Sequence, residues 1–249
     1  MIAGIDPSDL SGRSVSDAGD VNGDGIDDLI IGAPGGNSGA GESYVVFGSS
    51  SGFSASLDRS TLNGSNGFVI NGIDAGDSSG RSVSGAGDVN GDGIDDLIIG
   101  EGGSGLYDRT LGESYVVFGQ TSGFSSSLDL STLNGTNGFV ISGIDALAYS
   151  RTSVSGAGDV NGDGIDDLII ASERPFPETT SESYVVFGRA SSSMLKGDVD
   201  MDGDIDFSDI APFIAVLQSG VFQAEADCDC NTVVDFADIP AFIDILQQQ

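Results

Sequence analysis

The stretch Asp20-Val21-Asn22-Gly23-Asp24-Gly25-Ile26-Asp27-Asp28 recurs without change at residues 88–96 and 159–167, with spacings of 68 and 71 residues. Each copy lies in a longer repeat. The repeat begins with Gly-Ile-Asp and continues through Ser-Val-Ser, the acidic stretch, Asp-Leu-Ile-Ile and Glu-Ser-Tyr-Val-Val-Phe-Gly. Two copies add Gly-Phe-Val-Ile, at residues 67–70 and 138–141. Repetition of this kind indicates an array of similar structural units.

The apolar runs of the repeat predict strands that are buried on both faces. Residues 29–31 and 44–47 are apolar at consecutive positions, whereas strand side chains alternate between faces. Four strand-like runs per repeat and Gly-rich turns predict a mainly β fold over residues 1–190, with three four-stranded blades of a β-propeller. A β-solenoid or a β-sandwich is the alternative.

Three blades are fewer than the four to eight that propellers typically have, so we expect a partial propeller. Either further blades are missing or several copies of the chain assemble into a homo-oligomer. Residues 1–4 align with residues 140–143, the end of the strand that the third repeat lacks. An N-terminal strand is therefore expected to complete the last blade.

Composition excludes several classes of function. The 249 residues include 39 acidic and 8 basic side chains, for a net charge of -31, and no histidine. Such a charge repels nucleic acid and anionic lipids, and the absence of histidine excludes a Ser-His-Asp triad. No apolar stretch is long enough for membrane insertion, and residues 1–10 lack the features of a signal peptide. Cys228 and Cys230 lie too close for an unstrained disulfide, and we interpret them as incidental.

Each acidic stretch has the donor pattern of a calcium loop, because oxygen-bearing residues alternate and Gly permits the turn. Turn formation alone would explain Asp, Asn and Gly, but not strict alternation in three identical copies. Asp27, Asp95 and Asp166 lie outside this alternation and are expected to face solvent. The predicted ligands, with the Ile residues contributing carbonyl oxygens, are Asp20, Asn22, Asp24, Ile26 and Asp28; Asp88, Asn90, Asp92, Ile94 and Asp96; and Asp159, Asn161, Asp163, Ile165 and Asp167.

Residues 191–249 form a second predicted domain, with two calcium loops that each precede an amphipathic helix. Its halves repeat at a spacing of 29 residues. Thr232 stands where the second loop should have Gly, so that site is expected to be weaker. The predicted ligands, with Asp204 and Val233 contributing carbonyl oxygens, are Asp198, Asp200, Asp202, Asp204, Asp206 and Asp209; and Asp227, Asp229, Asn231, Val233, Asp235 and Asp238. About five calcium ions are expected in all.

The two regions resemble two known families. Residues 1–190 resemble the FG-GAP repeats of integrin-α-type propellers, through Ser-Val, Ala-Gly-Asp-Val-Asn-Gly-Asp-Gly-x-Asp-Asp-Leu and Gly32-Ala33-Pro34. Residues 100–102 and 171–173 depart from Gly-Ala-Pro. Residues 194–249 resemble a dockerin, a small all-α module that docks onto cohesin domains. Phe207 and Phe236 correspond to partner-selecting positions, or equally to core positions.

Together these resemblances imply an extracellular or cell-surface protein that binds calcium and recognises a protein or a glycan. The dockerin-like tail implies attachment to a cohesin-like or cell-surface protein. We expect no enzymatic activity, because the clustered carboxylates belong to the loops and Glu42, Glu113 and Glu182 recur once per repeat, as structural positions do. The alternatives are a structural fragment of a larger surface protein and an accessory part of a secreted polysaccharide-degrading enzyme.

Overall fold

The structure is a computed structural model that describes residues 2–3, 8–53, 56–102, 112–142, 152–172 and 182–189. The chain divides into two compact units, residues 1–89 with 93–188 and residues 90–92 with 189–249. All strands named below belong to the first unit. The predicted dockerin-like domain, with its two calcium loops, its helices and its cysteines, lies outside the described residues. Within the described ranges, no helix is long and apolar enough to span a membrane.

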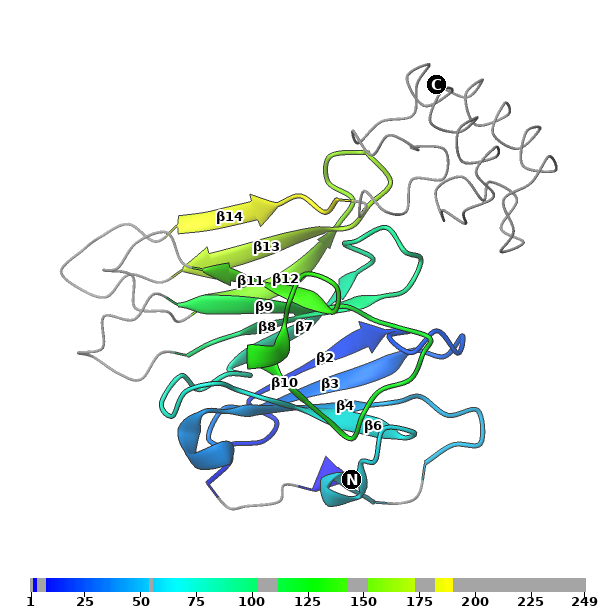
Figure 1. The fold of residues 1–249 in the computed structure, drawn as a ribbon, viewed down its shortest axis with the longest axis vertical. Helices are drawn as coiled ribbons and strands as arrows, with labels where there is room; N and C mark the ends of the chain where they lie inside the picture. The colour runs from blue at the N-terminus through cyan, green and yellow to red at the C-terminus, as the bar shows by residue number, and fades with distance from the viewer. Residues whose placement is uncertain are drawn as a thin grey trace, which may run out of the picture. The chain divides into compact units, whose positions relative to one another are not determined.

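The first unit is mainly β, and each repeat forms one antiparallel sheet (Figure 1). We call these sheets the first, second and third blades. The first contains β2 (Ser14–Gly19), β3 (Asp28–Ala33), β4 (Glu42–Val46) and β6 (Gly67–Asn71). The second contains β7 (Ser82–Gly87), β8 (Asp96–Gly100), β9 (Glu113–Val117) and β11 (Gly138–Ser142). The third contains β12 (Thr152–Gly158), β13 (Asp167–Ser172) and β14 (Glu182–Val186).

The short strand that precedes the last strand of each of the first two blades forms a parallel pair. The strand β10 (Ser127–Asp129) precedes β11 but pairs with β6 of the first blade. In the same way, β5 (Leu57–Asp58) precedes β6 and pairs with the N-terminal β1 (Ile2–Ala3). The helical segments in the described ranges are three 3-10 turns, η1 (Asn37–Gly39), η2 (Arg59–Thr61) and η3 (Leu130–Thr132).

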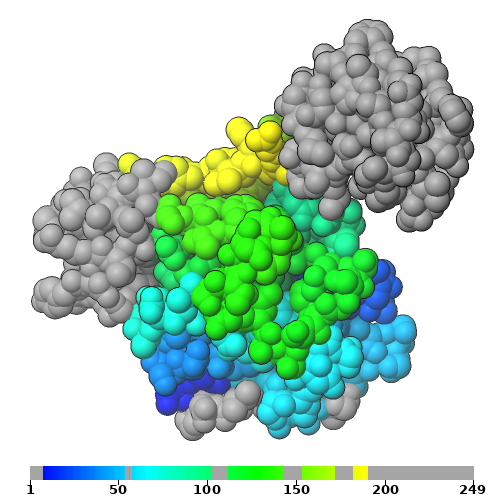
Figure 2. Space-filling model, in the orientation of Figure 1, coloured from blue at the N-terminus to red at the C-terminus, as the bar shows by residue number. Residues whose placement is uncertain are grey.

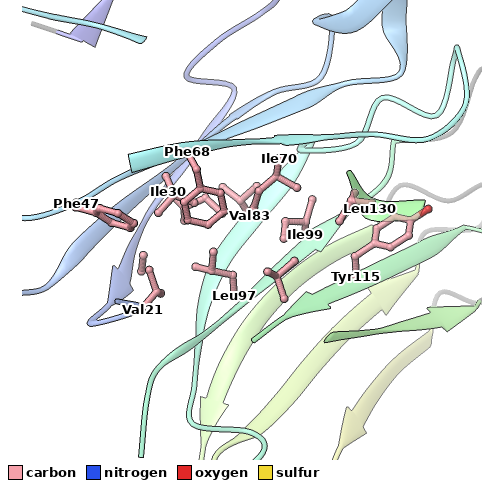
Figure 3. Packing of buried hydrophobic residues seen from close by; sticks show 13 residues of the cluster. Val21, Ile30, Phe47, Phe68, Ile70, Val83, Leu97, Ile99, Tyr115 and Leu130 are labelled. Carbon is pink, nitrogen blue, oxygen red and sulfur yellow. The ribbon is translucent and has the colours of Figure 1, made fainter. Parts of the chain in front are cut away.

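The middle strands are buried on both sides, as their apolar runs predict. All five residues of β8 are buried. The reason is that consecutive blades pack face to face. One cluster joins Val21, Ile30 and Phe47 of the first blade to Val83 and Leu97 of the second (Figure 3).

A second cluster of the same kind joins the second and third blades. There Val89, Ile98 and Val116 pack with Val154 and Leu168. The burial of apolar area between the blades is the main favourable contribution to this arrangement.

The prediction of a mainly β fold is confirmed, and the three sheets are consistent with a partial β-propeller. The third blade has three described strands, not four. The N-terminal strand was expected to complete that blade. In the structure, β1 instead pairs with β5, which leads into the last strand of the first blade.

Candidate metal centres

Each acidic stretch forms the connection between the first two strands of its blade. The connections join β2 to β3, β7 to β8 and β12 to β13. Near each connection the strand pair carries a bulge, between Asp17 and Gly19, Gly85 and Gly87, and Gly156 and Gly158. The loops are therefore equivalent in structure as well as in sequence.

In the first loop, the side chains at positions one, three and five accept hydrogen bonds from the backbone of the loop. The carboxylate of Asp20 accepts from the N–H of Asp24 at 2.9 Å and of Gly25 at 2.7 Å. The Asn22 side chain also accepts from Asp24 N–H, at 2.9 Å, and Asp24 accepts from Ile26 N–H at 3.0 Å. The oxygens of alternate residues therefore turn inward over one short segment. Gly25 has a φ of 84°, in the left-handed region that favours glycine.

The third loop repeats this pattern. The carboxylate of Asp159 accepts from Asp163 N–H at 3.1 Å and from Gly164 N–H at 2.9 Å. The Asn161 side chain accepts from Asp163 N–H at 2.8 Å. The backbone donors, Gly164 above all, hold the pKa of the Asp159 carboxyl below its usual range. An ionised carboxylate is the form that a cation requires.

The second loop shows two of the same contacts. Asp88 accepts from Gly93 N–H at 2.7 Å, and Asn90 accepts from Asp92 N–H at 2.9 Å. Among the residues that the structure describes, no group of three or more Asp, Glu, Cys or His side chains converges as a metal cage would require. The oxygens of positions one and three in all three loops, and of position five in the first and third, are instead held by the loop backbone. Each loop thus has hard oxygen donors, the class that calcium binds.

The ninth-position carboxylates, which the sequence predicts as ligands, are buried and tie each loop to its own blade. Asp28 is fully buried and accepts from Val21 N–H at 3.2 Å and from Gly48 N–H at 2.7 Å. Burial raises its pKa to about 6, although these two hydrogen bonds oppose the shift. Equivalent bonds join Val89 and Gly119 to Asp96, and Val160 and Gly188 to Asp167. These side chains have a structural role whether or not they also bind an ion.

The eighth-position residues correct one prediction. Asp27 is exposed, as expected. However, Asp95 accepts a hydrogen bond from Asp20 N–H of the preceding blade at 2.8 Å, and Asp166 accepts from Asp88 N–H at 3.0 Å. The expectation that both face solvent was wrong, because a repeat taken alone does not show what the next blade brings to it.

The sequence interpretation also missed two clusters around the tyrosines of β4 and β9. Arg59 lies 3.9 Å from the ring centroid of Tyr44 and forms an ion pair with Asp9 at 2.9 Å. In the second blade, the Tyr115 hydroxyl lies 2.7 Å from a carboxylate oxygen of Glu101 and 2.8 Å from one of Glu113. Arg59 is one of only 8 basic residues, and Glu101 replaces the Ala of Gly-Ala-Pro. A rare basic residue and an acidic residue in place of Ala were therefore the features of the sequence that could have indicated these two clusters.

Comparison with known proteins gives one family. No curated protein matches the chain significantly. The FG-GAP repeat model matches residues 12–46, 79–117 and 151–186, which confirms the resemblance of that region. FG-GAP repeats are non-catalytic, occur in extracellular or surface proteins and generally mediate protein–protein interaction. The dockerin-like resemblance stays a prediction. Each match covers the first three strands of one blade, so the chain contains three FG-GAP repeats, one in each blade.

Proposed function

We propose that this chain is an extracellular recognition module whose three FG-GAP loops bind calcium and stiffen the blades. The observation that carries the proposal is the equivalence of the loops. The first and third hold Asp, Asn and Asp at positions one, three and five, with the side-chain oxygens gathered over the loop backbone. The ion is proposed as a structural brace, with no role in catalysis.

Charge repulsion within the loops supports a cation. Besides burial, the negative charges of Asp24 and Asp20 raise the pKa of Asp28. Three carboxylates near one short segment repel each other, and a divalent ion bound there offsets that repulsion. Calcium suits the loops better than magnesium, because magnesium demands a small octahedral shell and retains its water.

We place recognition on the loops that join the second and third strands of the blades, because their sequences differ while the strands repeat. In the first blade this loop includes η1 (Asn37–Gly39). The corresponding segments 104–110 and 175–180 lie outside the described residues. The ligand class that we propose is a protein or a glycan at the cell surface.

For residues 194–249 we propose a dockerin-like role, with two further calcium ions and attachment to a cohesin-like or cell-surface protein. This proposal depends on the spacing of the acidic residues in the tail and on the resemblance described above. It assigns calcium two roles, bracing in the blades and shaping a docking surface in the tail.

Calorimetric titration of calcium into the chelator-treated full chain tests the proposal. We expect about five bound ions, from one ion per loop. Asp20→Ala removes the first ligand of one loop and should lower the stoichiometry by about one. Asp27→Ala is the matched control, because Asp27 has the same charge, belongs to the same loop and is exposed.

The two variants make the outcomes distinct. No heat of binding for the wild-type chain would refute calcium binding altogether. An equal loss in both variants would mean that the ion responds only to net charge. Changes in the tail, such as Asp198→Ala and Asp227→Ala, should reduce the count independently of Asp20→Ala.

A further inference from the structure

Consecutive blades dock through one repeated interface, and within the described residues no further blade covers the corresponding half of that interface on the third blade. Val21, Ile30, Val45 and Phe47 of the first blade are exposed by 7% or less, because the second blade covers them. We call their equivalents in the third blade the open face. These are Val160, Ile169, Val185 and Phe187, which are 56%, 39%, 50% and 60% exposed.

The first blade exposes the complementary half, which we call the counter-face. It consists of Val15, Leu29 and Phe53, which are 65%, 41% and 56% exposed. In the second blade, the equivalents of Val15 and Leu29 are Val83 and Leu97, at 4% and 1%. The open face and the counter-face therefore reproduce the two sides of an interface that already exists twice in the chain.

The phenylalanines show this correspondence most directly. Phe124 occupies in the second repeat the place of Phe53 in the first. It reaches back to the preceding blade, where its ring stacks on Phe68 at 4.2 Å and lies 5.8 Å from Phe47. Phe187 is the equivalent of Phe47. Phe53 of one copy is thus matched to Phe187 of another.

Strand pairing points to the same arrangement. β10 pairs with β6 through Leu128 and Ile70, and β5 pairs with β1 through Leu57 and Ile2. Since Leu57 and Leu128 are equivalent, Ile2 stands where the last strand of a preceding blade would be. In the described part of the chain β14 pairs with β13 alone, and it lies at the outer end of the row of blades (Figures 1 and 2).

We propose that a second copy of this chain docks its first blade, head to tail, on the open face of the third blade. In this arrangement β1 becomes the fourth strand of that third blade. In the first two blades the last strand pairs with the third strand through Ile70 and Ser43, and through Ile141 and Ser114. Ile2 is the equivalent of these isoleucines and Ser183 is the equivalent of these serines. Ile2 of one copy therefore pairs with Ser183 of the other.

Polar contacts of the internal interfaces carry over to the same site. The Ser14 hydroxyl accepts from Val83 N–H, and the Ser82 hydroxyl accepts from Val154 N–H, both at 3.1 Å. Ser153, the equivalent in the third blade, is exposed and is matched to Val15 N–H of the second copy. Likewise exposed Asp27 corresponds to Asp95 and Asp166, which accept from the preceding loop. The docking therefore needs no new type of contact.

Sedimentation velocity over a range of concentrations tests this proposal with the full chain in calcium buffer. The wild type should associate into dimers or larger species. Phe187→Asp on the open face and Phe53→Asp on the counter-face should each weaken self-association roughly ten-fold or more, since each places a charge in an apolar contact. Val140→Asp is the control. Val140 is 40% exposed, and it lies on β11 of the second blade, outside the open face and the counter-face.

Mixing the two variants distinguishes head-to-tail docking from symmetric pairing. The Phe187→Asp chain keeps an intact counter-face and the Phe53→Asp chain keeps an intact open face, so their equimolar mixture should form a heterodimer. A monomeric wild type at every concentration overturns the proposal, as expected if further blades or the tail cover the open face. Loss of association in Phe187→Asp alone, without rescue on mixing, also overturns it. Circular dichroism verifies that each variant is folded.

Discussion

The first and second blades place the same tyrosine on the third strand, but a cation lies beside it in the first blade and a second carboxylate lies beside it in the second. In the first blade, the Tyr44 hydroxyl donates to Glu42, two residues earlier on the same face of β4. The guanidinium of Arg59 lies over the Tyr44 ring, and Arg59 pairs with Asp9. Arg59 is fully buried, so this blade contains a buried cation balanced by a carboxylate.

In the second blade, Leu130 occupies the place of Arg59 and packs in the core between the blades. The Tyr115 hydroxyl then lies within hydrogen-bond distance of two carboxylates, those of Glu101 and Glu113. A phenol has one proton, so both contacts are hydrogen bonds only when one carboxyl is protonated and donates to the phenol oxygen. Burial raises the pKa of Glu101 to about 7, which favours that protonated form.

The comparison shows that one strand framework tolerates two electrostatic solutions. In the second blade, apolar Leu130 replaces the cation where the preceding blade packs, and titratable Glu101 takes the place of Ala33. The contribution of the first arrangement to stability should be nearly independent of pH near neutrality, whereas that of the second arrangement should depend on pH. Substitutions in each cluster test that difference.

The largest effect is expected for Arg59→Leu, which gives the first blade the residue of the second. It leaves Asp9, only 6% exposed, without its cation. Breaking a buried ion pair on one side costs about 3–5 kcal/mol. Urea unfolding monitored by circular dichroism measures this loss. Adding Asp9→Asn removes the uncompensated charge and should restore most of the stability; if the double variant is as unstable as the single one, lost packing and not charge is the cause.

A smaller, pH-dependent effect is expected for Glu101→Gln. The pKa of Glu101 is about 7 in the folded chain and about 4.5 in the unfolded chain. The stabilisation from its protonated form is complete below pH 4.5 and is lost as pH rises through 7. The unfolding free energy of wild type relative to Glu101→Gln should therefore fall by about 2–3 kcal/mol across this window.

The groups that face Glu101 define the controls for this experiment. Tyr115 and Glu113 contact it, and Asp77 adds to the upward shift of its pKa. Glu42→Gln, the corresponding change beside Tyr44, is the matched control and is measured over the same window. Parallel profiles for wild type and Glu101→Gln would show that the pKa of Glu101 does not change on folding.

Much of this architecture could be predicted from local pattern. The consecutive apolar residues of β8 indicated a strand buried on both faces, and the repeated acidic loop located the turn before it. Contacts between repeats could not be predicted in this way. The sequence of its own loop predicts that Asp95 faces solvent. Its hydrogen-bond donor, the N–H of Asp20, belongs to the preceding blade and is therefore not apparent from that loop. The charge environment of Tyr115 on β9 depends on Glu101, which follows the end of β8. The repeat pattern alone does not bring these two residues together.

The smallest effect is expected from removing each tyrosine hydroxyl. Tyr115→Phe deprives buried Glu101 of a hydrogen-bond partner at 2.7 Å, which should cost about 1–3 kcal/mol. Tyr44→Phe leaves only half-buried Glu42 without its donor and retains the ring under Arg59, so about 0.5–1.5 kcal/mol is expected. The loss in Tyr115→Phe should also vary with pH as Glu101 titrates, whereas the loss in Tyr44→Phe should not. Unfolding free energies of both variants at acidic and alkaline pH give both comparisons. If the two variants lose the same stability at every pH, the two blades do not differ electrostatically.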